Sequence, residues 1–257
     1  MFSHAITRIP GPDYPKGLTT STLPAPDLEL ALRQHDAYVR CLESLGLTVE
    51  VLPAAPGFPD ACFVEDTAVV VRETAVITRP GAPSRTGETV HIEAALAPHR
   101  PLARIKAPGT LDGGDILQVG KHFFIGVSDR TNDEGARQLA AILAVHGYES
   151  SIIKVAAGLH LKSSLNFVGE DTMLVTADFA GHPAIADFKQ IVCPADEEYA
   201  ANTVLVNGTL IMPTGYPRTR ALLEPLNLPI VELDTSEYRK MDGGLTCLSL
   251  RLQNPVS

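Results

Sequence analysis

TAVVVRETAVITRPGAPSRTGE, residues 67–88, contains two short apolar stretches separated by a polar turn, followed by a loop that ends in Arg-Thr. Short runs rich in Val and Ile between turn residues are typical of strands, so this segment predicts a β-hairpin that leads into a helix. The same plan recurs as DILQVGKHFFIGVSDRTNDEG at 115–135 and as TVLVNGTLIMPTGYPRTRA at 203–221. A weaker copy, LNFVGEDTMLVTADF at 165–179, lacks the Arg-Thr pair. We interpret these segments as copies of one repeated unit.

A polar loop precedes each predicted hairpin, and the distance between successive loops gives the length of the repeat. One polar residue of each loop serves as a marker: Asp66, Asp112, His160, Asn202 and Cys247. Successive markers are 46, 48, 42 and 45 residues apart. A period near 45 in a chain of 257 residues predicts five units.

Stretches with helical character lie between the hairpins, the clearest of them with apolar residues at helical spacing. We predict helices at 26–45, 87–97, 132–146, 183–188 and 218–226. Short apolar strands are predicted to follow, as at 48–52, 151–155 and 229–233. The unit is therefore strand, strand, helix, strand. Units that bury an apolar face by stacking on one another close into a ring, and such a ring would gather the five polar loops into one site at one end of its axis.

The composition limits the class of protein and its partners. Of the 257 residues 45% are hydrophobic, enough for a sizeable core, and we predict a single domain that covers residues 1–257. The formal net charge of −9 argues against nucleic acid or an anionic membrane as a partner and favours a cationic small molecule. The longest apolar run, 139–145, is too short to span a membrane, and the opening residues MFSHAITRIPGP lack the pattern of a secretory signal. We therefore expect a cytoplasmic protein, and the sequence leaves a homodimer open.

The reactive residues of the polar loops indicate nucleophilic catalysis. The chain has four cysteines and no CxxC pair, so we expect free thiols in a reducing compartment. A ring would bring Cys247 and His160 together with several acids: the thiolate attacks, the histidine moves protons and a carboxylate orients the histidine. The surplus acids indicate a cationic substrate. Cys247, His160 and Asp112 also match zinc by ligand type. Their wide spacing argues against a constitutive metal, so we expect neither metal nor cofactor and leave open only an adventitious inhibitory zinc.

Eight segments, spread in order over essentially the whole chain, carry specific motifs. They are GLTTS (17–21), FPDACFVEDTAVV (58–70), RPGAPSRTGE (79–88), APGTLDGGDILQVG (107–120), SDRTNDEG (128–135), LHLKSSLNFV (159–168), MPTGYPRTR (212–220) and DTSEYRKMDGGLTCLSLRL (234–252). Together they resemble the dimethylarginine dimethylaminohydrolase family of the guanidino-group-modifying (pentein) superfamily. The resemblance implies an α/β fold, a five-bladed α/β propeller of ββαβ repeats around a central active site. It also implies cofactor-free hydrolysis of a dimethyl- or monomethylarginine to citrulline and a methylamine through a covalent thiouronium on the cysteine.

The resemblance assigns roles to individual residues. Cys247 in GGLTC would be the nucleophile, His160 in LHLK the general acid and base, and Asp112 in LDGGD the acidic partner of His160. Superfamily members carry Asp or Glu at the place of Asp112, so the distance from this shorter acid to the imidazole has to be measured. The implied substrate contacts are Leu18 (backbone) and Asp60 at the α-amino end, Glu65 and Asp66 at the guanidinium, Arg85 and Arg130 at the α-carboxylate, and Met241 through its main chain.

Plainer interpretations stand beside these roles. By its local context alone, Cys247 fits a buried strand cysteine and His160 a hydrogen-bonded core histidine. Arg85 and Arg130 would equally well brace the repeat loops, because Arg218 occupies the same place in another copy. Two rival functions also fit the residues: an arginine deiminase or amidinotransferase-like enzyme, and a non-catalytic ring that binds amino acids.

Overall fold

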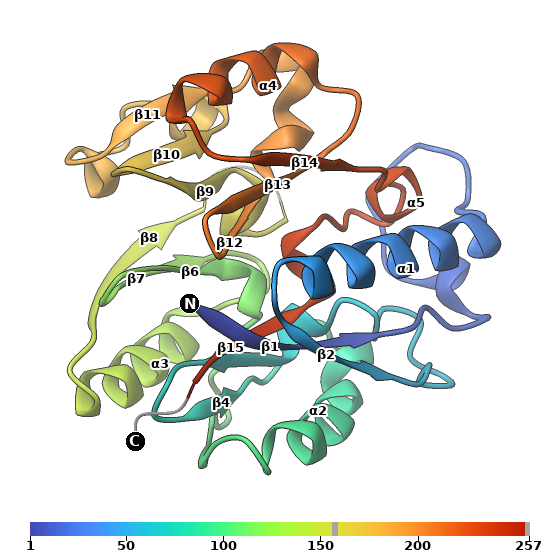
Figure 1. Cartoon of the computed structure of the whole chain (residues 1–257). Coiled ribbons are helices and arrows are strands. Elements are labelled where there is room, and N and C mark those ends of the chain that lie inside the picture. Colours follow the sequence, from blue (N-terminus) through green and yellow to red (C-terminus); the bar gives the residue numbers. More distant parts are fainter. Residues whose placement is uncertain (156–158, 255–257) are drawn as a thin grey trace.

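Five small β-sheets surround a common axis in the computed structural model, which describes residues 1–155 and 159–254 (Figure 1). In each sheet two strands pair antiparallel, and the third lies parallel to the middle strand. The sheets form blades 1 to 5: β15 (Leu250–Gln253), β1 (Phe2–Arg8) and β2 (Thr48–Leu52); β3 (Ala68–Val70), β4 (Ala75–Ile77) and β5 (Leu102–Arg104); β6 (Ile116–Val119), β7 (His122–Val127) and β8 (Glu149–Lys154); β9 (Leu165–Gly169), β10 (Thr172–Val175) and β11 (Lys189–Val192); β12 (Val204–Val206), β13 (Thr209–Pro213) and β14 (Ile230–Leu233).

Most of the helices lie on the outside of the ring, between the second and third strands of a blade (Figure 1). The α-helices are α1 (Leu28–Ser44), α2 (Thr89–Leu96), α3 (Asp133–Val145), α4 (Pro217–Leu223) and α5 (Ser236–Arg239). The two longest begin at side-chain caps: Asp27 accepts a hydrogen bond from the Leu30 N–H, and Asn132 accepts one from the Gly135 N–H. These caps fix where α1 and α3 begin.

The hairpin of blade 5 turns at Asn207 and Gly208, with φ of 50° and 86°. Left-handed backbone at both central residues is the type I′ turn, which Asn-Gly favours because its twist matches that of the strands. The Asn207 amide also donates to the carbonyls of Phe2 and Leu45, and its oxygen accepts from the Phe2 N–H. This turn therefore also fastens blade 5 to blade 1.

Buried apolar side chains fill the junctions between neighbouring blades. Val76 of blade 2, Phe123 of blade 3 and Leu139 of α3 belong to one buried cluster. Corresponding clusters join blades 3 and 4, blades 4 and 5, blades 5 and 1, and blades 1 and 2. Blade 1 unites the two ends of the chain, with Ile6 of β1 opposite Leu250 of β15. Since burying one large apolar side chain stabilises by about 1.5–3 kcal/mol, these junctions hold the ring closed.

The arrangement confirms the predicted five-bladed α/β propeller of ββαβ repeats. The predicted helix at 183–188 is wrong, because that segment contains only the 3₁₀ helix η7 (Pro183–Ile185). The backbone there makes i→i+3 hydrogen bonds, from the Ile185 N–H to the His182 carbonyl and from the Ala186 N–H to the Pro183 carbonyl, which close a 3₁₀ turn rather than an α-helical one. The predicted domain also includes residues 156–158 and 255–257, which lie outside the described residues.

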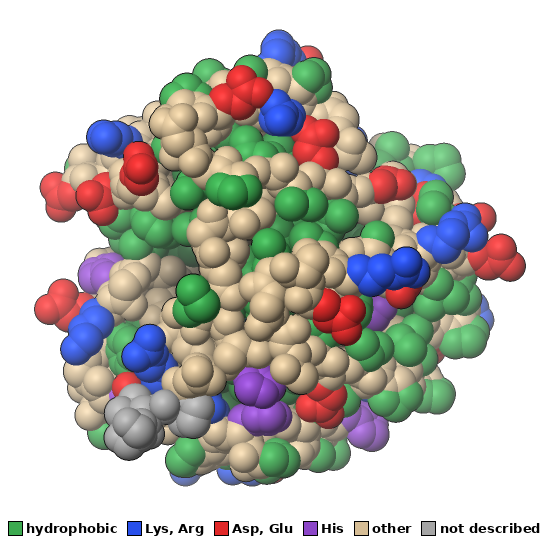
Figure 2. Space-filling model, in the orientation of Figure 1, with side chains coloured by type: hydrophobic (Ala, Val, Ile, Leu, Met, Phe, Trp, Pro, Cys, Tyr) green, Lys and Arg blue, Asp and Glu red, His purple; other side chains and the backbone are tan. Residues whose placement is uncertain are grey.

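Over residues 1–155 and 159–254, no helix combines the length and the apolar character needed to cross a membrane. On the face drawn in Figure 2, acidic and basic side chains lie mostly toward the periphery, and hydrophobic and uncharged groups occupy most of the middle. Acidic and basic side chains are interspersed along that periphery, so this face carries no extended patch of a single charge.

Candidate active site

A 3₁₀ turn lies immediately before the first strand of each hairpin, and neighbouring turns contact one another around the axis. The turns are η2 (Val64–Thr67), η4 (Gly113–Asp115), η5 (Leu161–Ser163), η8 (Ala195–Ala201) and η10 (Thr246–Leu248), which precede β3, β6, β9, β12 and β15. They correspond to the polar loops of the repeat. The fold thus brings these loops together as the ring argument predicts.

A pocket of about 150 Å³ is lined by Asp66 of η2, by Cys247 of η10, and by Asp112 and His160, which directly precede η4 and η5, whereas the loop of η8 contributes no residue to it. Every predicted site residue except Glu65 lines it: Leu18, Asp60, Asp66, Arg85, Asp112, Arg130, His160, Met241 and Cys247. The remaining lining residues, to which the sequence analysis gave no role, are Thr19, Thr20, Phe63, Leu159, Asp242 and Gly243.

His160 lies between two carboxylates. Its Nε2 is 3.0 Å from Oδ2 of Asp112 and 3.9 Å from Oδ1 of Asp66, and all three side chains are buried. The shorter acid therefore reaches the imidazole, and its other oxygen accepts a hydrogen bond from the Gly81 N–H. Burial favours the neutral imidazole, but the charge of Asp66 and the hydrogen bond to Asp112 outweigh it and raise the pKa of His160 to about 9. At neutral pH His160 is a protonated acid.

Gly114 allows Asp66 and His160 to approach each other. Its N–H donates to Oδ1 of Asp66 at 2.9 Å, and a β-carbon on Gly114 would lie 2.7 Å from Cγ of His160. Burial disfavours the charged form of Asp66, but His160, Arg85 and this N–H outweigh it and lower the pKa of Asp66 to about 2. Asp66 is therefore an anion at neutral pH, and it lines the pocket.

Cys247 is half-buried in the middle of η10, with Sγ 3.9 Å from the hydroxyl of Thr246. Burial, followed by the charges of Glu65 and Asp66, raises the pKa of the Cys247 thiol to about 12. The thiol of the empty pocket is therefore protonated at neutral pH.

Arg85 is anchored inside the pocket wall. Its Nη1 donates to Oδ2 of Asp66 at 2.5 Å, and its Nη2 donates to Oε2 of Glu88 at 2.9 Å. Arg130 is half-buried, and its guanidinium forms no ion pair with any residue in the described ranges 1–155 and 159–254. Both arginines line the pocket as predicted, but Arg130 has the guanidinium that is free to receive an anion.

We expect Arg85→Ala to lower the free energy of unfolding by about 3–5 kcal/mol, because the carboxylates of Asp66 and Glu88 stay buried without their cation. Urea unfolding followed by circular dichroism measures this loss. The matched control is Arg218→Ala: Arg218 occupies the same place in blade 5, but its exposed guanidinium binds Asp196 and Glu197, so a smaller loss is expected. Equal losses in the two variants would contradict a buried anchor at Arg85.

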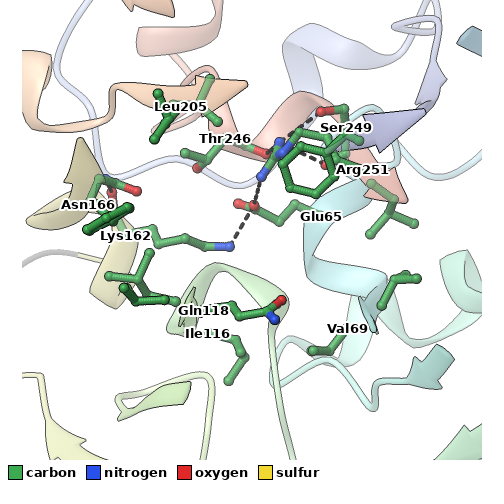
Figure 3. A pocket seen from close by; sticks show the side chains of 18 of the residues that line it. Glu65, Val69, Ile116, Gln118, Lys162, Asn166, Leu205, Thr246, Ser249 and Arg251 are labelled. Carbon is green, nitrogen blue, oxygen red and sulfur yellow. Dashed lines mark hydrogen bonds and ion pairs between the residues drawn. The ribbon is translucent and has the colours of Figure 1, made fainter. Parts of the chain in front are cut away.

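Glu65 lines a second cavity of about 330 Å³, where it lies between Lys162 and Arg251 (Figure 3), and Asp66 does not line that cavity. Its Oε1 accepts from Nζ of Lys162 at 2.6 Å and from Nη2 of Arg251 at 3.3 Å. Neighbouring residues in a 3₁₀ turn point about 120° apart, so Glu65 and Asp66 face different cavities. The structure therefore does not bring Glu65 into the pocket, although its charge acts on the Cys247 thiol.

Asp66, Asp112 and His160 offer ligand atoms that lie within 4.8 Å of one another. Two oxygens and one imidazole nitrogen are suitable ligands for several divalent metals. A metal must displace the proton from His160, however, and the two acids that would help to hold a metal also raise the pKa of that imidazole. A metal at this place would therefore bind less readily as pH falls below the pKa of His160.

The segment 18–20 closes one side of the pocket. The Leu18 N–H donates to both carboxylate oxygens of Asp60, at 3.0 and 3.2 Å. Thr20 donates to the carboxylate of Asp242 through both its N–H and its hydroxyl. Burial raises the pKa of Asp60, whereas Arg85, the Leu18 N–H and Arg130 oppose that rise. Asp60 and Leu18 are thus held together on the same wall, as the assigned roles require.

Comparison with known proteins supplies the family. The family model for arginine deiminase matches residues 53–205, a range that contains Asp66, Asp112 and His160. N(G),N(G)-dimethylarginine dimethylaminohydrolase of Pseudomonas aeruginosa is 47% identical over 98% of this chain and 100% of that protein. This chain belongs to the dimethylarginine dimethylaminohydrolase family.

Other dimethylarginine dimethylaminohydrolases agree with this assignment. The protein from Streptomyces coelicolor is 39% identical over 97% of this chain and 96% of its own length. A solved structure of a cysteine-to-serine mutant of the Pseudomonas aeruginosa protein, complexed with citrulline, has a TM-score of 0.96 at 46% identity and covers 98% of this chain and 100% of that one. The N-terminal domain of ArgZ, an arginine dihydrolase from Cyanobacteria, has a TM-score of 0.87 at 18% identity over 99% of both chains, which shows a common fold.

In this member of the family, Asp115 supports two parts of the site, a role that the sequence motifs alone do not assign. Its Oδ1 accepts from the Leu161 N–H at 2.9 Å, and its Oδ2 accepts from the hydroxyl of Ser128 at 2.7 Å. The Ser128 oxygen in turn accepts from the Arg130 N–H. Asp115 therefore holds both the turn that follows His160 and the loop that carries Arg130. The available signal was the second Asp of LDGGD.

Proposed function

We propose that this protein hydrolyses an Nω-methylated arginine to citrulline and a methylamine through a covalent intermediate on Cys247. The observation that carries the proposal is one pocket that contains a thiol, an imidazole between two carboxylates, and an arginine without an ion-pair partner among the described residues. The relatives named for this reaction, one of them complexed with citrulline, support it.

The substrate binds by its two ends. Asp66, an anion beside His160 and Cys247, receives the guanidinium and brings its carbon next to Sγ. Arg130 binds the α-carboxylate, and Arg85 holds Asp66 in place at the guanidinium end through their ion pair. Asp60 and the backbone carbonyl of Leu18 accept hydrogen bonds from the α-ammonium. The substrate carries a guanidinium cation at one end and an α-ammonium and an α-carboxylate at the other. Each of these groups meets a protein group of opposite charge or a hydrogen-bond acceptor, so the substrate binds in one orientation.

The reaction begins when the Cys247 thiol loses its proton to solvent and the resulting thiolate forms a C–S bond to the guanidinium carbon. His160 as imidazolium donates its proton to the methylated nitrogen, the C–N bond breaks, and the methylamine leaves. The remaining thiouronium is attacked by water, from which the now neutral His160 takes a proton. Collapse of this second adduct breaks the C–S bond and releases citrulline. Asp112 keeps the imidazole oriented and stabilises its charged form in both steps. The sum is one water consumed, and no group is oxidised or reduced.

The test is to incubate the protein with asymmetric dimethylarginine, monomethylarginine and arginine, and to measure citrulline and the released amine. Citrulline in equal amount with dimethylamine or methylamine is expected. Release of ammonia from arginine, with no turnover of the methylated forms, would instead support a deiminase, the rival that the match of residues 53–205 to the arginine deiminase model favours. No turnover of any of the three would leave a binding ring.

We expect Arg130→Ala to raise KM for the methylated arginine about 10- to 100-fold and to leave kcat within a few-fold. An α-carboxylate far from the reacting carbon is bound alike in the ground and transition states, so its loss weakens binding without slowing the chemistry. Steady-state kinetics of citrulline formation measure both constants. The matched control is a substrate analogue without the α-carboxylate, for which the variant and the parent protein should have similar KM. A defect confined to kcat would contradict the assignment.

A further inference from the structure

Asn202 makes three hydrogen bonds that no step of the proposed reaction uses. The residue lies at the end of η8, and its side chain is buried. Its Nδ2 donates to the Lys162 carbonyl at 3.2 Å and to Oγ1 of Thr246 at 3.1 Å. Its Oδ1 accepts from the Thr246 N–H at 3.0 Å. Both halves of one amide are thus used within the ring of turns.

The partners of Asn202 lie next to the two reacting side chains. Lys162 belongs to η5, two residues after His160, and Thr246 directly precedes Cys247 in η10. These two turns belong to blades 4 and 1, and the blade preceded by η8 lies between them in the ring. The Asn202 side chain therefore spans from the turn of the imidazole to the turn of the thiol.

The backbone beside the nucleophile is shaped to accept this amide. A β-carbon on Gly244 would lie 2.5 Å from both Cγ and Oδ1 of Asn202. A contact that short does not occur between real atoms, so a side chain at position 244 and the present place of Asn202 exclude each other. Gly244 thus supplies the space that Asn202 occupies.

Asn202 also orients the hydroxyl nearest to the thiol. Because its Nδ2 donates to Oγ1 of Thr246, the hydrogen of that hydroxyl is free to point elsewhere, and Sγ of Cys247 is 3.9 Å away. A hydroxyl that points at sulfur stabilises the thiolate and lowers the pKa of the thiol, against the larger effect of burial.

We propose that Asn202 is a positioning residue that holds His160 and Cys247 at the separation and orientation needed for proton transfer to the leaving amine. This inference rests on the proposed function. The groups assigned to the substrate, Asp66 and Arg130, lie in or beside η2 and β7, outside the hydrogen bonds of Asn202. Loss of the amide should therefore slow the chemical step and leave substrate binding almost unchanged.

Asn166 is the matched control. It is also a buried asparagine, and its Nδ2 donates to the same Lys162 carbonyl at 2.7 Å and to the Ala201 carbonyl at 2.8 Å. It does not bond to η10. Asn166→Ala therefore removes a similar amide from the turn of the imidazole without breaking the link to the turn of the thiol.

The experiment compares Asn202→Ala, Asn166→Ala, Gly244→Ala and the double variant Asn202→Ala/Gly244→Ala. Each kcat is divided by the fraction of protein molecules whose Cys247 reacts with an electrophile, so that only enzyme with a reactive thiol is counted. We expect Asn202→Ala to lower kcat about 30- to 100-fold with KM within about 3-fold, since a small misplacement of reacting groups costs that much. Asn166→Ala should retain kcat within about 3-fold at a similar loss of thermal stability. Gly244→Ala should lower kcat about 10-fold alone and add little to Asn202→Ala, because the clash is then gone.

The pH dependence of Cys247 alkylation gives a readout that needs no turnover. The alkylation limb is the pH range over which the rate of Cys247 alkylation rises as the thiol ionises. In Asn202→Ala this limb should move to higher pH, and in Asn166→Ala it should not. Equal kcat for the two asparagine variants, a defect confined to KM, or additive effects of Asn202→Ala and Gly244→Ala would overturn the proposal. If the parent protein turns over none of the substrates, the proposed function fails, and an unmoved alkylation limb in Asn202→Ala would then refute the positioning role separately.

Discussion

Cys247→Ser should lower kcat for the methylated arginine by about 10⁴-fold or more, because a serine hydroxyl is a much weaker nucleophile at neutral pH than a cysteine thiolate. Oxygen and sulfur are similar in size, and Cys247 is only half-buried, so the fold and the binding of substrate should persist. Citrulline formation measures the loss of turnover, and isothermal calorimetry with the methylated arginine measures the binding that remains.

The control for Cys247→Ser is Cys41→Ser. Cys41 is a free thiol in α1 that does not line the pocket, so its replacement should leave kcat almost unchanged. Mass spectrometry of enzyme quenched during turnover should detect an adduct on Cys247 in the parent protein and none in Cys247→Ser. Turnover by Cys247→Ser at the rate of the parent protein would end the proposed mechanism.

The fold could be predicted because its information is repeated along the chain. Each hairpin carries its own turn residues, as Asn207-Gly208 does in blade 5, and local signals of this kind are readable in a single sequence. The pairing of β1 with β15 could not be predicted in this way. It joins Phe2–Arg8 to a strand at the other end of the chain, and it depends on closure of the ring rather than on a local pattern.

The members of the site could be predicted, but not the direction in which each points. Glu65 and Asp66 are adjacent acids with the same local context, and only the geometry of η2 sends one to each cavity. Arg85 and Arg130 share the Arg-Thr motif. Glu88 lies one 3₁₀ turn after Arg85 and binds its guanidinium. At the same distance after Arg130 lies Asp133, which forms no ion pair with Arg130 in the part of the chain that the structure describes. Repeat symmetry fixes where a residue lies, and its neighbours fix what its side chain can bind.

The second large effect concerns how the thiol becomes a thiolate. In the empty pocket burial, Glu65 and Asp66 raise the pKa of Cys247 to about 12, so thiolate forms only as pH rises toward that value. An exposed cysteine titrates near about 8.5, and alkylation of Cys247 at pH 7 should therefore be about 10³-fold slower than that of an exposed thiol. We expect a bound guanidinium cation to reverse the sign of the local field and to lower the pKa of the thiol, so that the substrate helps to ionise its own nucleophile.

Two pH profiles test this: the alkylation rate of Cys247 in the free enzyme, and kcat, which reports ionisations in the bound complex. The rising limb of kcat should lie at least about two pH units below the alkylation limb. At higher pH kcat should fall again as His160 loses its proton, and because the bound cation also disfavours the imidazolium, this falling limb should lie below the pKa of about 9 that His160 has without substrate. Guanidinium ion should increase the ultraviolet thiolate absorbance of the free enzyme at neutral pH, whereas urea, which has the same shape without the charge, should not. Coincident limbs near neutral pH would mean that His160 as imidazolium already holds a thiolate in the empty pocket, and substrate-assisted ionisation would be wrong.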